Sequence, residues 1–106
     1  MRMWKVRPKF LCNKHLLGEH VEMHMFAGVL RKKMKISGYI SKGLMEVHSI
    51  RKRHDELASE MLRRGMHHKS PLQPVRLYNS GKVDVKNSMK VLAKRCRECR
   101  KKMANK

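Results

Sequence analysis

The stretch that decides the fold is LCNKHLLGEHVEMHMFAGVLRKK, residues 11–33. Its apolar residues recur at steps of three and four, which predicts an amphipathic helix over residues 14–33 with Asn13 as its N-cap. The stripe expected to face the core consists of Leu16, Met23, Ala27, Leu30 and Met34, widened by Leu17 and Val21. A second face repeats His15, Glu19, Glu22 and Phe26, which helical spacing makes vertical neighbours.

Two further helices follow from the same periodicity. The first is expected over residues 44–64, where a buried stripe is formed by Val47, Ile50, His54, Leu57 and Met61, and Gly65 ends the helix. The second is expected over residues 84–102, capped by Asp84, with a stripe formed by Val85, Met89, Leu92, Cys96 and Cys99.

The intervening and flanking segments are expected to be irregular. Residues 35–43 contain two Ser/Gly turn signals, and residues 66–81 contain Pro71, Pro74 and an Asn-Ser-Gly turn, so both are interpreted as loops. Residues 1–11 are expected to be extended, because Pro8 excludes a helix there. No repeat and no strand is indicated, so the fold class is all-α: a single compact domain over residues 1–106 with about three helices.

The composition indicates a polyanionic partner. Lys and Arg number 27 against 8 Asp and Glu, a formal net charge of +19, and nucleic acid is the commonest polyanion. Candidate phosphate contacts are the cluster Arg31, Lys32 and Lys33 and the basic strip that contains Lys90 and Lys94. The run Arg51, Lys52 and Arg53 is more typical of a solvated, partly ion-paired face. No membrane-spanning run or signal peptide is recognised, so a cytoplasmic, intracellular location is expected.

Glu19 and Glu22 are the only formally charged residues between Lys14 and Arg31. Carboxylates weaken phosphate binding, so their position suggests a chemical site set into a DNA-binding surface. The alternative from these residues alone is a helix with two solvated glutamates.

Metal binding is the other chemistry that the sequence raises. Cys96 and Cys99 form a C-x-x-C, half of a zinc signature, for which Cys12 or the pair His67 and His68 would be the further ligands. Two small buried thiols on one helix face are the simpler interpretation. His20-x-Glu22-x-His24 lacks the glutamate of H-E-x-x-H, so no metal ligand and no cofactor are expected.

Two blocks of the chain resemble the phage-type pyrimidine-dimer DNA glycosylases. The stretch from Leu11 through His15, Glu19 and Glu22, followed by Phe26, Gly28 and Arg31-Lys32, is similar to the family's first helix, an L-x-x-x-H-L-x-x-E-x-x-E pattern. Residues 50–65, IRKRHDELASEMLRRG, are similar to its second helix. With the N-terminus, the resemblance covers about the first two thirds of the chain.

This resemblance implies a DNA repair enzyme that is both a pyrimidine-dimer glycosylase and an AP lyase. Its nucleophile would be the α-amine of Met1, followed by Arg2 as in the family, and Glu22 would match the catalytic glutamate. His15 would lie near the dimer, and Arg2 would hold a phosphate or the damaged strand. Glu19 would have either a supporting or a purely structural role. The implied partner is double-stranded DNA with a damaged or abasic site, bound by a monomer with no cofactor and no membrane.

The chain also departs from the family pattern. Val21 and Met25 stand where the phage-type enzyme has arginines, and its aromatic C-terminal tail is replaced by a basic, polar end. Trp4 and Tyr78 are the main aromatic residues left for stacking. These differences concern lesion preference more than lyase chemistry. The alternative function is a non-catalytic, basic, helical nucleic-acid-binding protein.

Overall fold

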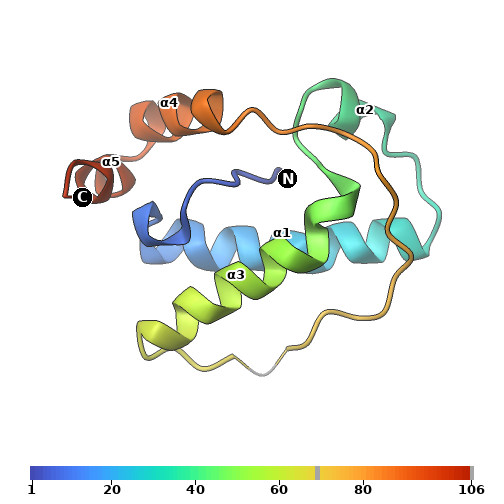
Figure 1. Ribbon diagram of the computed structural model, residues 1–106, viewed down its shortest axis with the longest axis horizontal. Helices are drawn as coiled ribbons and strands as arrows, with labels where there is room; N and C mark the ends of the chain where they lie inside the picture. Colours follow the sequence, from blue (N-terminus) through green and yellow to red (C-terminus); the bar gives the residue numbers. More distant parts are fainter. Residues whose placement is uncertain (69, 106) are drawn as a thin grey trace.

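Two long helices, α1 (Asn13–Arg31) and α3 (Ile50–Arg63), pack against each other at the centre of the protein. The computed structural model describes residues 1–68 and 70–105, and Figure 1 shows α3 crossing α1. Their contact buries the predicted apolar stripes, with Leu16, Met23 and Leu57 fully shielded from solvent. Within the described residues every regular element is helical, which confirms the all-α prediction.

The start and the outer face of α1 differ from the prediction. Cys12, rather than Asn13, caps the helix, because the Cys12 thiol accepts the backbone N–H of His15. The apolar stripe is also narrower than expected, since Leu17, Val21 and Met34 are 42%, 53% and 56% exposed. Part of the surface of α1 and the segment after it therefore carries uncovered apolar side chains.

The segment between the long helices is more structured than predicted. A short helix, α2 (Ser37–Ser41), lies inside the expected loop, and its Tyr39 ring packs edge-on against Phe26 with 5.3 Å between ring centroids. A five-residue helix is not stable alone, and this contact stabilises it by packing. The turn residues of this segment carry no sign of that contact.

The second long helix begins later than predicted. Residues 44–49 are not continuous with it, although Val47–Ser49 form a 3-10 turn, η2. Leu44 accepts the backbone N–H of Met3 at 2.7 Å, and Val47 donates its N–H to Ser80 at 2.9 Å. Backbone groups used in these long-range hydrogen bonds cannot also serve a helix, so the helix starts at Ile50.

The predicted third helix is two helices, α4 (Val85–Arg95) and α5 (Arg97–Ala104). Asp84 caps α4 through Asn87 N–H at 3.0 Å, as predicted. The break falls at Cys96, whose backbone is extended (φ −126°, ψ 111°) and whose thiol accepts the Cys99 N–H to cap α5. The apolar periodicity runs through the break and so conceals it.

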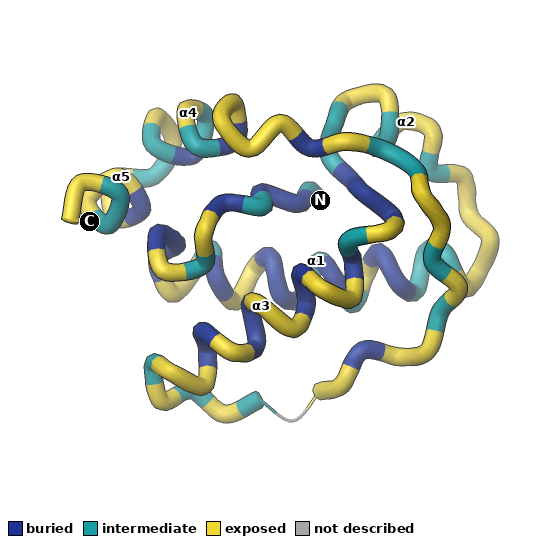
Figure 2. Tube along the Cα trace, in the orientation of Figure 1, coloured by how far each residue is buried: buried dark blue, intermediate teal, exposed yellow. Residues whose placement is uncertain are grey.

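The connection from α3 to α4 runs around the edge of the molecule, as expected for residues 66–81, and Figure 2 shows that much of it is exposed. It returns to the core near Leu72 and Val83, which are buried. None of the described helices combines the length and the apolar character that a membrane span requires.

Candidate active site

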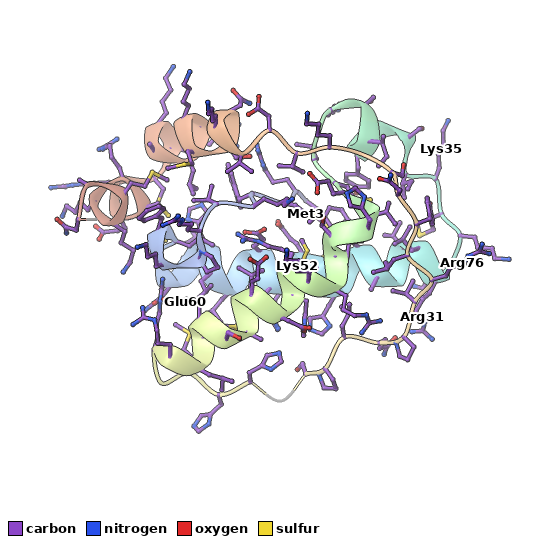
Figure 3. All side chains as sticks on the ribbon, in the orientation of Figure 1. Met3, Arg31, Lys35, Lys52, Glu60 and Arg76 are labelled. Atoms are coloured by element: carbon purple, nitrogen blue, oxygen red, sulfur yellow. The ribbon has the colours of Figure 1, made fainter. Side chains whose placement is uncertain are left out.

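The N-terminal segment lies in the interior of the fold, between α1 and α4. Figure 1 shows the course of this segment, and Figure 2 shows that much of it is buried. Met3, labelled in Figure 3, is fully buried together with Val6 and Leu11. After the single 3-10 turn η1 (Pro8–Phe10) the chain enters α1. The N-terminus is therefore held in a defined place by packing on both sides.

Glu19 anchors this segment from α1. Its carboxylate accepts the backbone N–H groups of Trp4 at 3.1 Å and Lys5 at 3.4 Å, and it forms two hydrogen bonds with Arg53 at 2.7 and 2.8 Å. Lys5 adopts the left-handed conformation (φ 56°), so a sharp bend of the chain is fixed at this carboxylate. Glu19 has four donors and no free face, which makes its role structural.

Arg53 corrects the prediction for the basic run on the second helix. Arg51 and Lys52 are exposed as expected, but Arg53 is only 2% exposed and pairs with Glu19 inside the core. A buried guanidinium needs a buried carboxylate, and the partner lies 34 residues away, beyond the reach of any local pattern.

Glu22 lies one turn beyond Glu19 and faces the start of the chain. Its Oε2 accepts the backbone N–H of Arg2 at 3.4 Å. Burial raises the pKa of Glu22, while the Arg2 N–H and the charge of the terminal ammonium act to lower it. Glu22 is thus a half-buried carboxylate next to the start of the chain.

Arg2 connects the N-terminus to α4. Its guanidinium lies 3.8 Å from the centre of the Trp4 ring and donates to Ser88 Oγ at 3.1 Å. Burial, followed by repulsion from Arg95, lowers the pKa of Arg2. Its Nε is buried with no hydrogen-bond partner among the described residues. Ser88 is a site residue that the sequence did not single out, and no local pattern marks it.

Met1 borders an open cavity of about 570 Å³, between the N-terminus and α2. Its wall includes Tyr39 and two exposed lysines, Lys35 and Lys42. The lysines make the rim positive, which favours a phosphate-bearing ligand next to the amine.

The other predicted DNA contacts occupy two separate regions. Arg31, Lys32 and Lys33 are exposed at the carboxyl end of α1, and Lys90 and Lys94 are exposed on α4. Figure 1 shows these regions on opposite sides of the molecule, with the N-terminus between them. Figure 3 labels Arg31 and Arg76 at the first region, where Arg31, Lys33, Arg76 and Tyr78 line a cavity of about 560 Å³.

His15 is oriented differently from a simple surface histidine. Its Nδ1 lies 3.2 Å from Cys12 Sγ and 3.6 Å from Cys99 Sγ. Burial, then the charge of Lys14, lowers its pKa. The ring is also edge-on to Trp4, with 6.0 Å between centroids, so it is part of the same packed region as Arg2.

Side chains able to bind a metal gather in two clusters apart from the carboxylate site. One consists of Cys12, His15, Cys96 and Cys99, and the other of His20, His24, His54 and His68. In each cluster four potential ligand atoms lie within 4.8 Å of one another. Glu22 is in neither cluster.

Comparison with known proteins gives one match. The model of the family described as pyrimidine dimer DNA glycosylase matches residues 1–74, which include the N-terminus, α1 and α3. No curated protein and no solved structure shows significant similarity to the chain. Helices α4 and α5 lie outside the matched range.

Proposed function

The chain belongs to the pyrimidine dimer DNA glycosylase family, and from that premise we propose that it also cleaves the damaged strand as an AP lyase through the α-amine of Met1. Two features support this extension. Glu19 fixes the N-terminal segment in the interior through the Trp4 N–H. A second carboxylate, Glu22, accepts the backbone N–H of Arg2, the residue after Met1, at 3.4 Å. A primary amine in its neutral form is a nucleophile that forms imines with sugar carbons.

The reaction proceeds in two stages. The neutral amine of Met1 attacks C1′ of the 5′ sugar of the dimer, the bond from C1′ to the base breaks, and the sugar ring opens to leave an imine. Glu22 stabilises the positive charge that develops on the sugar and accepts protons from the amine. The imine makes the C2′ proton acidic. Its removal expels the 3′ phosphate oxygen, and water then hydrolyses the imine to regenerate the amine.

DNA binding would draw on the basic residues on either side of the N-terminus. Arg2, steadied by Trp4 and Ser88, is suited to a phosphate beside the reacting sugar. His15 would face the damaged strand through Nε2, since Nδ1 is directed at sulfur. Arg31, Lys32 and Lys33 on one side and Lys90 and Lys94 on the other would contact the backbone of one duplex, bound by a monomer. Extruding a base from such a duplex is easier where damage has weakened stacking.

The experiment is borohydride trapping on a duplex with one thymine dimer, with undamaged and abasic duplexes in parallel. The protein is prepared with a free Met1 amine. We expect a covalent adduct with dimer and abasic DNA, mapped to Met1, and none with undamaged DNA. A retained N-terminal extension turns the amine into an amide and should abolish trapping.

Glu22→Gln separates chemistry from binding. Strand cleavage should fall by at least about 100-fold, because the carboxylate acts on charge that develops during the reaction, while affinity for dimer DNA is unchanged or increased. Glu56→Gln, an exposed carboxylate on α3, is the matched control and should cleave normally. Binding without any adduct on any duplex would overturn the proposed chemistry and favour a non-catalytic DNA-binding protein. An adduct on abasic DNA alone would retain the lyase but not the dimer specificity.

A further inference from the structure

The cluster of Cys12, His15, Cys96 and Cys99 brings together residues from the start of α1 and the start of α5. Cys12 caps α1 and His15 lies in the first turn of α1, whereas Cys96 caps α5 and Cys99 lies in the first turn of α5. Two pairs with the same spacing of three residues therefore meet, each at the start of a helix. We propose that these four side chains bind a structural zinc ion.

The distances fit tetrahedral zinc. With Zn–S about 2.3 Å and Zn–N about 2.0–2.1 Å, two sulfur ligands lie about 3.8 Å apart, and a sulfur and a nitrogen about 3.5 Å apart. Cys12 Sγ is 3.8 Å from Cys96 Sγ, while His15 Nδ1 is 3.2 Å from Cys12 Sγ and 3.6 Å from Cys99 Sγ. All four ligand atoms lie within 4.8 Å of one another, so one ion at the centre can reach them once the longer pairs close to tetrahedral distances.

Backbone N–H groups donate to each of the three sulfurs. The backbone N–H of Cys12 donates to Cys99 Sγ at 3.2 Å, that of His15 to Cys12 Sγ at 3.5 Å, and that of Cys99 to Cys96 Sγ at 3.4 Å. Cys12 and Cys96 also stand at helix N-termini, where the helix dipole favours negative charge. N-caps are ordinarily Ser, Thr, Asp or Asn, so two cysteines in this position call for a reason beyond capping.

A disulfide does not explain the cluster. The Cys12 and Cys96 sulfurs are 3.8 Å apart, against about 2.05 Å in an S–S bond, and all three cysteines are free thiols. Three thiolates and one imidazole are a standard donor set of structural zinc sites. Four protein ligands close the coordination sphere, which assigns the ion a structural rather than a catalytic role.

Bound zinc would hold α5 in place, a role that its apolar contacts are too few to fill. Cys99 is the only buried residue of α5, and most of the helix is charged. The helix packs against α4 and η1, so an ion held by Cys96 and Cys99 would fasten the C-terminal helices to the start of α1. The site would thus connect the part of the chain matched by the family model to the part outside it.

The test is metal content and spectroscopy on the full-length protein, so it does not depend on enzymatic activity. After passage over a chelating resin, elemental analysis should find zinc bound at this site. Replacement by Co²⁺ should give a near-ultraviolet thiolate-to-cobalt charge-transfer band together with intense tetrahedral visible bands. Cys99→Ser should lose this zinc and the charge-transfer band. His15→Cys, which keeps four ligands, should retain the metal, whereas His15→Ala should bind it more weakly.

Failure of Cys99→Ser to fold leaves the proposal testable on the wild-type chain. X-ray absorption at the zinc edge should then show sulfur at about 2.3 Å. A folded protein that contains no zinc after growth in zinc and shows no thiolate band with Co²⁺ would overturn the proposal. So would zinc whose absorption spectrum shows no sulfur ligand.

The second cluster points to another ion on independent evidence. His20 and His24 lie one helical turn apart on α1 and meet His54 of α3 and His68 of the following connection. The Nε2 atoms of His20 and His68 are 2.8 Å apart. His24 Nε2 is buried with no hydrogen-bond partner among the described residues. An ion bound by these nitrogens would satisfy that atom.

His54 has the outer contact that metal-bound histidines usually show. Its Nδ1 lies 2.9 Å from Asp55 Oδ1, a hydrogen bond that can be kept, while its Nε2, 3.1 Å from the Ser70 carbonyl oxygen, would exchange that contact for the ion. Imidazole is a good ligand for Zn²⁺, Cu²⁺ and Ni²⁺. We infer that the four histidines form a site for a divalent ion of this class.

Zinc titration into chelator-treated protein distinguishes the two sites. Total binding should reach two equivalents, of which His24→Ala removes one while the thiolate-to-cobalt band is unchanged. Cys99→Ser should remove the other. Zinc binding that stops at one equivalent, is unaffected by His24→Ala and is lost with Cys99→Ser would overturn the histidine site and leave the cysteine site in place.

Discussion

The buried pair of Glu19 and Arg53 allows a stringent test, because both stability and the position of the N-terminus depend on it. Glu19 is 1% and Arg53 2% exposed. Arg53→Met removes two of the four donors to the Glu19 carboxylate, both on the charged guanidinium, and leaves the backbone N–H groups of Trp4 and Lys5. Breaking one partner of a buried pair typically costs about 3–5 kcal/mol, against a total stability of about 5–15 kcal/mol. We expect a loss of unfolding free energy in that range.

Adding Glu19→Gln to Arg53→Met tests whether the loss of stability comes from the unpaired buried charge. In Glu19→Gln/Arg53→Met neither member of this buried pair carries a charge, and the Gln oxygen still accepts the Trp4 N–H. The double variant should therefore be more stable than Arg53→Met alone, with a coupling energy of about 1–3 kcal/mol. Lys52→Met, an exposed neighbour on the same helix, is the control and should change stability by less than about 0.5 kcal/mol.

Urea unfolding followed by circular dichroism measures the wild type, the single variants Arg53→Met and Glu19→Gln, the double variant and the Lys52→Met control, because the coupling energy requires both single variants. The denaturant slopes are compared to confirm that the same transition is observed. A loss below about 1 kcal/mol for Arg53→Met, or strict additivity in the double variant, would refute the electrostatic interpretation. Trapping yields with abasic DNA should follow stability across the series, because loosening Trp4 and Lys5 also frees Met1 to move away from Glu22.

Three further outcomes are expected. Arg63 and Arg64 lower the pKa of Glu60 to about 2, so the ionised carboxylate stabilises the fold at pH values above its ordinary pKa of 4.5. After allowance for solvent screening, wild type should be about 1 kcal/mol more stable than Glu60→Gln at neutral pH. In urea titrations this difference should vanish as the pH falls toward 2. Val21→Arg and Met25→Arg, both at exposed positions on α1, should tighten binding to duplex DNA and steepen its salt dependence by about 0.9 per new phosphate contact, measured by fluorescence anisotropy. Gly81→Ala should lower unfolding free energy by more than about 2 kcal/mol, because Gly81 has φ 85° and an added Cβ would collide with the Met45 carbonyl oxygen.

Local patterns in the sequence were sufficient for most of the helical scaffold. The three-to-four periodicity located α1 to within a few residues and the end of α3, although α3 begins at Ile50 rather than at residue 44, and Asp84 marked the start of α4. Helix periodicity and side-chain capping act over one or two turns, so the residues that determine them are neighbours in the chain. The resemblance to the family, which the family match confirms, directed attention to Met1 and Glu22.

Features that depend on residues far apart in the chain were decided only by the tertiary structure. Arg53 looked like a solvated cation until its pairing with Glu19 was visible, and the break at Cys96 was hidden within a continuous apolar stripe. The sequence offered Cys96 and Cys99 as half of a metal site, but their convergence with Cys12 and His15 depends on how α5 docks. A charge is buried, or a ligand set completed, only when packing supplies the partner, and that partner has no fixed spacing in sequence.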